Sequence, residues 1–255
     1  MKPDVVPGAE RRRVFLPHFG RQALVPWALV LCLVAVQAVV ERAGGFRDPA
    51  MWKWYVLLGL TGDGLFHHGR VWQLATHAWL HGGLAHLLVN GLFLGLAGSR
   101  VERMLGWRVF ARVFVVGVLG GAAGHLAAAS WSDDAAPLVG ASGACMALLL
   151  LITTLSPESR MWPLPVSARN LGRGVLMAAA ILVMIDPAHA LPGFSLAGIW
   201  LSGHGMDSWF QIGHACHLGG GLAGWLYARW LLRPRWNLEK LRRERSRQEA
   251  RAGRP

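Results

Sequence analysis

The sequence contains few charged residues and few cysteines. Asp, Glu, Lys and Arg make up 16% of its 255 residues, hydrophobic residues make up 53%, and the mean hydropathy is +0.35. A typical soluble domain carries about 25% charged residues, so this composition argues against that class and favours a membrane protein. The three cysteines, Cys32, Cys145 and Cys216, all fall in apolar stretches. Their odd number and their spacing argue against a framework of structural disulfides.

Two motifs of hydrolytic enzymes are also missing. The sequence has no His-Glu-x-x-His motif and no pair of aspartates inside an apolar segment. Possible metal ligands occur at His77 and His81, and at His214, Cys216 and His217, without an obvious further ligand to complete either site. We therefore expect no metal, no other cofactor and no aspartyl protease chemistry.

Long apolar segments account for the hydrophobic composition. A helix needs about 20 residues to cross a bilayer, and six stretches reach or approach this length. They are residues 23–40, 84–98, 109–129, 138–155, 174–191 and 212–232. We therefore predict an all-α membrane protein with six transmembrane helices, a membrane domain over residues 23–232 and both termini on one side.

The basic residues give this arrangement a direction. Of the 26 Lys and Arg residues, 22 fall on the side that carries both termini, whereas the acidic residues divide evenly between the two sides. The positive-inside rule then makes residues 1–22 a cytoplasmic N-terminal segment and residues 233–255 a basic cytoplasmic tail. This tail is short, contains three glutamates and directly follows an apolar segment. We therefore expect it to lie near lipid and not to bind nucleic acid.

The connection between the first two apolar segments is long and rich in tryptophan. Residues 41–83 include Trp52, Trp54, Trp72 and Trp79 among glycines and histidines. Tryptophan favours the headgroup region of a bilayer. We therefore predict an interfacial loop between the first two helices, on the non-cytoplasmic side.

Four polar residues lie near the outer starts of three apolar segments. His86 and Asn90 belong to the second segment, Ser142 to the fourth and His217 to the sixth. At 1.5 Å per residue, all four lie within roughly 10 Å of the outer ends of their helices. Polar residues are costly inside a membrane and by default indicate a functional site.

The residue types in this group suit acyl transfer. A serine hydroxyl becomes a good nucleophile when a base such as histidine takes its proton, and the oxyanion that forms needs fixed hydrogen-bond donors. Ser142 lies between Gly140 and Gly143, which permit close approach of another backbone. Gly220 and Gly224 give the sixth segment a small-residue face for packing against a neighbour, and packing on the fourth segment would bring His217 to Ser142. Without a placed carboxylate, these residues predict a Ser/His dyad.

These residues resemble the motifs of the rhomboid intramembrane serine proteases. The stretch from Trp72 to His81, followed by His86 and Asn90, is similar to the loop and second-helix signature of that family. Three further motifs are similar. A GxxxExxxG pattern consists of Gly98, Glu102 and Gly106, and a GxSG motif spans Gly140 to Gly143. The sixth-helix motif runs from His217 to Gly220 and includes Gly224.

The resemblance implies a six-helix rhomboid-like bundle and a role for each motif residue. Ser142 is then the nucleophile, His217 the general base, and His86 with Asn90 the oxyanion site, while Glu102 is structural. The implied substrates are transmembrane proteins cut near the outer boundary of the lipid bilayer. The implied location is the bacterial inner (plasma) membrane. We interpret His77 and His81 as interfacial or packing residues.

Three positions depart from the family pattern. Gln73 replaces the usual arginine, which puts the hydrogen bonds of the first loop in question, and Met146 replaces an aromatic residue that often stacks on the catalytic histidine. His214 stands where Asn or Asp is common. We take His217 as the base because Gly220 and Gly224 follow it at three and seven positions. The alternative is a catalytically silent rhomboid-like protein that binds or escorts membrane proteins, although such proteins typically lack the serine or the histidine.

Overall fold

Helices make up most of the residues that the computed structural model describes. These are residues 23–46, 48–129, 137–160, 165–189, 191–206, 210 and 212–233, with a few positions of the tail between 242 and 249. Within them the extended pairings are two isolated bridges, Leu60 with Leu138 and Arg160 with Ser167. The predicted N-terminal segment, residues 1–22, and most of the predicted tail lie outside the described residues.

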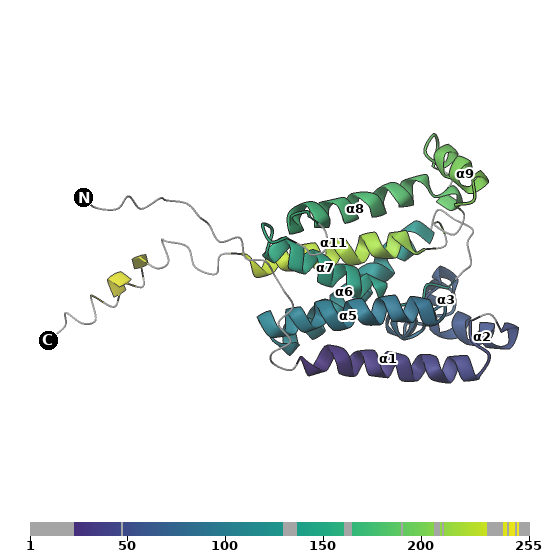
Figure 1. The fold of residues 1–255 in the computed structure, drawn as a ribbon, viewed down its shortest axis with the longest axis horizontal. Helices are drawn as coiled ribbons and strands as arrows, with labels where there is room; N and C mark the ends of the chain where they lie inside the picture. The colour runs from purple at the N-terminus through teal and green to yellow at the C-terminus, as the bar shows by residue number, and fades with distance from the viewer. Residues whose placement is uncertain are drawn as a thin grey trace.

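Six long helices form the bundle shown in Figure 1. The predicted six-helix architecture is confirmed, and each helix overlaps one predicted apolar segment. The helices are α1 (Leu24–Arg42), α5 (Leu84–Leu105), α6 (Trp107–Ala129), α7 (Ser142–Leu155), α8 (Ala168–Ile185) and α11 (His214–Leu231).

Four predicted helix boundaries were wrong by several residues, each for a local reason. One is the end of α8, at Ile185 and not at residue 191, because Pro187 disfavours helix at the residue before it. Helix α5 continues past residue 98 through a charged turn and ends at Gly106, whose φ of 87° does not continue a helix. Helix α7 begins at Ser142 and not at residue 138, because Leu138 pairs with Leu60. Helix α8 begins six residues earlier than predicted, since the Ser167 side chain accepts a hydrogen bond from the Asn170 N–H at 3.3 Å.

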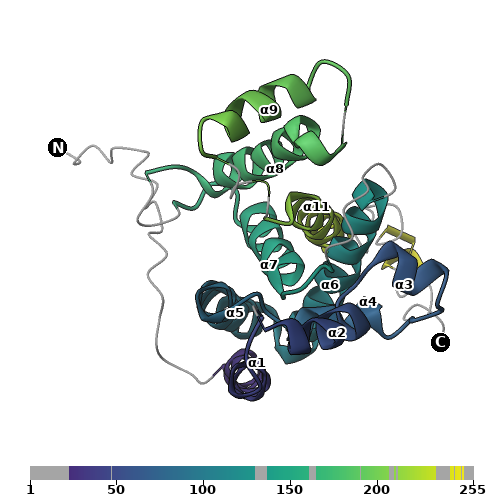
Figure 2. The same cartoon turned by 90° about the vertical axis from the view of Figure 1, so that its right-hand side faces the viewer.

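The six helices differ in how well they suit a membrane. Helices α1, α5, α6 and α8 are long and apolar enough to cross one, whereas α7 has 14 residues and is shorter. Helix α11 carries two histidines and a run of glycines, and it is not among the four. Figure 2 shows α7 at the centre of the bundle, with α5, α6, α8 and α11 around it. Ten of its 14 residues are buried, so protein and not lipid surrounds this short helix.

Small residues allow α6, α7 and α11 to approach closely. A Cβ atom at Gly220 would collide with the backbone of Gly143, and one at Gly224 with the backbone of Ala147. A Cβ atom at Gly121 would lie 2.7 Å from Cys216 Sγ. The predicted small-residue face of the sixth apolar segment therefore packs closely, and the neighbour that it contacts is the fourth segment.

Short helices fill the connections at one end of the bundle. The connection between α1 and α5 contains α2 (Pro49–Leu58), α3 (Gly62–Phe66), α4 (Gln73–Thr76) and the 3-10 helix η1 (His77–Trp79). The connection between α8 and α11 contains the 3-10 helix η2 (Pro187–His189) and α9 (Ser195–Gly203). The sequence analysis did not predict α9.

Candidate active site

Ser142 is the first residue of α7 and is half-buried. The turn before it is held by the connection between α1 and α5. Gly140, with a φ of 111°, donates its N–H to the His77 carbonyl at 2.9 Å, and Leu138 exchanges two backbone hydrogen bonds with Leu60 at 2.9 and 3.0 Å. The first N–H groups of a helix have no acceptor within it. The backbone around Ser142 therefore offers donors in a fixed position.

His86 and Asn90 lie beside this turn. A Cβ atom at Gly140 would be 2.8 Å from both Cε1 and Nε2 of His86 and 3.3 Å from Nδ2 of Asn90. The Gly82 N–H donates to Nδ1 of His86 at 3.3 Å, which leaves the ring proton on Nε2. Among the described residues Asn90 Nδ2 is buried and has no acceptor. Both side chains thus present N–H groups next to the start of α7.

The start of α11 lies beside the start of α7. His217 occupies the first turn of α11, and Gly220, one turn later, contacts Gly143, the residue after Ser142. Gly224 continues the contact one turn further on, so His217 lies on the α7 side of its helix. His217 is also close enough to His86 for an electrostatic interaction.

His214 lies next to His217 and is 9% exposed. The two imidazole rings are 6.1 Å apart, edge to face. Met146 is half-buried, one turn after Ser142 on α7. The structure therefore brings Ser142, His217, His86 and Asn90 to one end of the bundle, with His214 and Met146 in the adjacent turns.

Gln73, which stands where the family usually has arginine, forms several hydrogen bonds within the connection between α1 and α5. Its side chain is fully buried; Nε2 donates to the carbonyls of Val56 and Leu57 at 2.8 and 3.2 Å, and Oε1 accepts from the Thr61 N–H at 3.3 Å. The Gln73 carbonyl also lies 2.8 Å from Nδ1 of His77. Through His77, this network reaches Gly140 and the turn before Ser142.

His81 packs against His86 at the edge of the candidate site. Its ring is fully buried and lies 5.1 Å from the ring of His86 at an interplanar angle of 76°. Tyr55 Oη donates to the His81 carbonyl at 3.0 Å. Burial, and second the neighbouring His86, lower the pKa of His81 to about 4. His81 is therefore a neutral packing partner of His86 near pH 7.

Cys216, for which the sequence predicted no structural disulfide, is a neighbour of the candidate site. The residue is 1% exposed, and its Sγ lies against Gly121 and Gly143. Its thiol also interacts with the Ser142 side chain. Its place directly before His217 was the available sequence signal, but the contact itself depends on how α6, α7 and α11 pack.

Glu102 lies at the other end of α5 from His86. Its carboxylate accepts a hydrogen bond from the Val25 N–H at 3.2 Å, in the first turn of α1. The positive end of the α1 helix dipole also stabilises a carboxylate at this position. This contact supports the structural role expected for Glu102.

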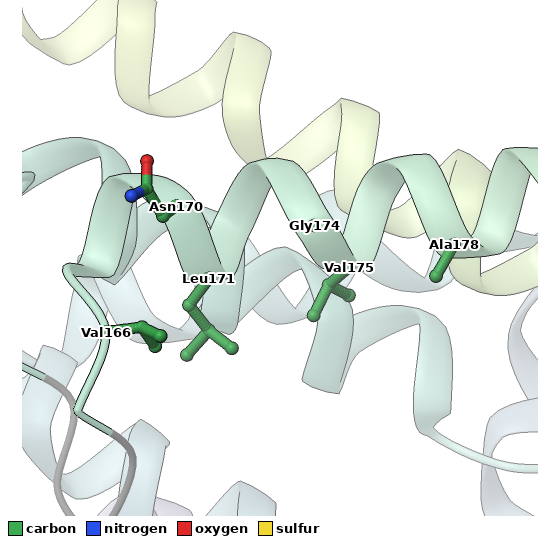
Figure 3. A pocket seen from close by; sticks show the side chains of 6 residues that line it. All are labelled: Val166, Asn170, Leu171, Gly174, Val175 and Ala178. Atoms are coloured by element: carbon green, nitrogen blue, oxygen red, sulfur yellow. The ribbon is translucent and has the colours of Figure 1, made fainter.

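The described residues contain no group of three or more His, Cys, Asp or Glu side chains placed to hold a metal ion. They do contain an apolar groove of about 330 Å³ along α8, shown in Figure 3. It is lined by Val166, Asn170, Leu171, Gly174, Val175 and Ala178. The groove therefore belongs to the half of α8 near its first residue, away from η2 and α9.

Comparison with known proteins gives consistent matches. The family model for the Rhomboid domain matches residues 68–234, about two thirds of the chain. RHOMBOID-like protein 5 of Arabidopsis thaliana is 35% identical over 92 residues, which cover 36% of this chain and 29% of that protein. Rhomboid protease GluP of Bacillus subtilis is 30% identical over 149 residues, covering 58% of this chain and 26% of that protein. Rhomboid-related protein 3 of Homo sapiens is 35% identical over 80 residues, covering 31% and 19%.

The chain spans less than a third of the length of each of these relatives. The domain match, however, includes α5, α6, α7, α8 and α11, and with them every residue of the candidate site. Together with the apolar helices it establishes an integral membrane protein. The chain belongs to the rhomboid family.

Proposed function

We propose that this protein is an intramembrane serine endopeptidase that hydrolyses peptide bonds of membrane-anchored proteins. The main support is the meeting of two helix starts: Ser142 begins α7, and Gly143 contacts Gly220, one turn after His217. The position of His86 and Asn90 beside Gly140 adds donors at the same place. One relative, from Bacillus subtilis, carries the name of a protease.

The proposed reaction proceeds through an acyl-enzyme. His217 takes the proton of the Ser142 hydroxyl as Oγ attacks the carbonyl carbon of the scissile bond. The oxyanion that forms accepts hydrogen bonds from Nε2–H of His86, Nδ2–H of Asn90 and the Ser142 N–H. His217 then gives its proton to the leaving amine as the C–N bond breaks. Water then loses a proton to His217 and attacks the carbonyl carbon of the ester. As the bond between this carbon and Oγ breaks, His217 returns the proton to Ser142 and the new carboxyl end leaves.

The proposed location follows from the charge distribution. We place both termini on the cytoplasmic side of a bacterial inner (plasma) membrane, because most Lys and Arg residues lie on that side. The starts of α7 and α11 then face the outer side. Cleavage consequently takes place near the outer boundary of the bilayer, on substrates that are themselves transmembrane proteins.

The decisive experiment uses the purified full chain in detergent or liposomes. Wild type is offered a fluorophosphonate probe and a transmembrane reporter, beside Ser142→Ala and His217→Ala. We expect labelling at Ser142 and cleavage by wild type, with both lost in Ser142→Ala and cleavage lost in His217→Ala.

Two outcomes would reject the peptidase proposal. One is cleavage that survives in both variants. The other is a folded wild type that binds the reporter without cutting it or reacting with the probe, which would support the silent rhomboid-like alternative. Insensitivity of the activity to chelators separates the serine mechanism from a metal-dependent one.

A further inference from the structure

Helix α9 is a separate apolar element in the connection that leads to His217. Its nine residues, Ser195–Gly203, include no charged side chain. Gly198 is its buried residue, and a Cβ atom there would collide with the Ile185 carbonyl and lie 2.9 Å from Cδ of Pro187. Helix α9 therefore packs directly on the last turn of α8.

The other side of α9 carries large apolar side chains. Leu196, Ile199 and Trp200 are 68%, 55% and 60% exposed, and their i, i+3, i+4 spacing places them on one face, opposite Gly198. Phe194, just before the helix, is 50% exposed. Apolar surface in water costs about 25 cal/mol per Å², so a contiguous face of this kind calls for a partner.

The direction of α9 differs from that of the long helices. In Figure 2 the view runs along the bundle, so α1, α5, α7 and α11 appear nearly end-on, whereas α9 appears lengthwise. Figure 1 places α9 at the same end of the bundle as α2. A helix that lies across the bundle at its end has its axis in the plane of the membrane.

The surface next to α9 belongs to a membrane-spanning helix. Only 17% of α8 is buried inside the protein, and its Met177 and Ile181 are 63% and 53% exposed. Helix α9 packs on the last turn of this helix, so it lies next to a surface that is exposed to lipid where α8 crosses the membrane. Trp200 lies 4.2 Å from the ring of His204, and a tryptophan beside a polar group is typical of the headgroup region.

We propose that α9 lies in the headgroup region of the leaflet nearest to Ser142, with Leu196, Ile199 and Trp200 in contact with lipid. The helix thereby fixes the connection between α8 and α11 to the membrane surface. This role is independent of the peptidase proposal, because it requires neither Ser142 nor His217 to act. A second copy of the chain or another protein segment on the same face is the competing occupant.

The test measures the depth of single labelled positions in the full chain reconstituted in phosphatidylcholine vesicles. Cys32 is exposed, whereas Cys145 and Cys216 are buried, so a Cys32→Ala background should react little with a nitrobenzoxadiazole maleimide. Leu196→Cys and Ile199→Cys are then labelled in this background. Quenching is measured with lipids that carry a nitroxide near the headgroup or deep in the acyl chain, and with aqueous iodide.

Two control positions calibrate the depth. Met177→Cys, on α8, reports the lipid-facing surface of a membrane-spanning helix, and Glu158→Cys, with a side chain 78% exposed, reports water. We expect the labels on α9 to be quenched most strongly by the headgroup nitroxide and to emit at shorter wavelength than the label at Glu158→Cys.

Three results would overturn the proposal. Iodide quenching equal to that at Glu158→Cys would place α9 in water. Stronger quenching by the deep nitroxide than by the headgroup nitroxide would place it inside the bilayer core. Protection from both iodide and lipid nitroxides would show that protein covers the face. Because the readout is depth, failure of the peptidase proposal leaves this test intact.

Discussion

Two pairs of helices in this protein have opposite surroundings. Helices α7 and α11 touch through glycine backbones in the middle of the bundle and carry Ser142 and His217, whereas α8 and α9 lie at its edge and have few buried residues. The edge helix α8 satisfies the length and hydropathy of a membrane span, and neither inner helix does. Ser142 and His217 thus lie on the inner pair, where neighbouring protein groups can offset the cost of a polar side chain.

The largest expected difference between the two pairs comes from filling a glycine. Gly220→Leu forces apart backbones that touch at Gly143, and we expect it to lower the free energy of unfolding by about 3 kcal/mol. The matched variant is Gly174→Leu on α8, where a Cβ atom meets nothing within 4 Å. There the better helix propensity of leucine should leave stability unchanged or raise it by up to about 1 kcal/mol. Thermal unfolding in detergent measures both; equal losses would show that α8 is packed as tightly as α11.

A second prediction concerns the protonation of His81, a buried residue next to the candidate site on the inner pair of helices. The pKa of His81 is about 4 in the folded chain and near 6.5 when unfolded. Unfolding therefore takes up a proton between these values, so the free energy of unfolding should fall as pH drops from about 6.5 to about 4, by about 3 kcal/mol in all. Above pH 6.5 His81 makes no such contribution.

The control for this pH effect is His81→Gln, which removes the titrating group. The melting temperature of this variant should fall less steeply than that of wild type over the same pH range. Parallel curves for the two proteins would contradict a buried neutral His81.

A third, smaller difference separates a buried amide from an exposed one. Gln73→Ala removes three hydrogen bonds from the network that reaches Gly140, and we expect a loss of about 2 kcal/mol with reduced activity. Asn170→Ala, on the exposed side of α8, should change stability by less than about 0.5 kcal/mol. Gln73→Glu keeps the acceptor for Thr61 but loses the donors to Val56 and Leu57. Its activity should stay low; full activity would assign Gln73 a packing role alone.

The last prediction concerns activity and not stability, and it distinguishes the two histidines of α11. His217→Ala should lower kcat/KM by on the order of 10⁴-fold, whereas His214→Ala should lower it less than about tenfold, or 1.4 kcal/mol. The same purified samples serve both measurements. Survival of activity in His217→Ala with its loss in His214→Ala would reverse the assignment of the base.

The sequence predicted the helices better than their ends. Each of the six long helices overlaps an apolar segment of the sequence, because the apolar residues of a segment determine whether it avoids water. The start of α7 could not be predicted in this way. Leu138 is as apolar as the helix, and it lies outside the helix because it pairs with Leu60. Helix α9 was missed because nine residues flanked by glycines give too short a periodic pattern.

The candidate site shows the same division. Spacing grouped His86 with Asn90, and the glycines at 220 and 224 correctly predicted a face for close packing, whose neighbour in the structure is the fourth apolar segment. The contacts that Gln73 and Cys216 make around the candidate site could not be predicted. Gln73 reaches residues more than ten positions away, and Cys216 meets Ser142 across two helices. Such contacts depend on the packed arrangement and leave no periodic signal in the chain.

The shortness of α7 has a consequence for access to solvent. Its 14 residues extend about 21 Å at 1.5 Å per residue, against a hydrocarbon core of about 30 Å. With its last residue at one face of the bilayer, its first would stop roughly 10 Å below the other. Ser142 then lies below the membrane surface, so the water that the proposed hydrolysis requires would have to reach it between the surrounding helices and not through lipid.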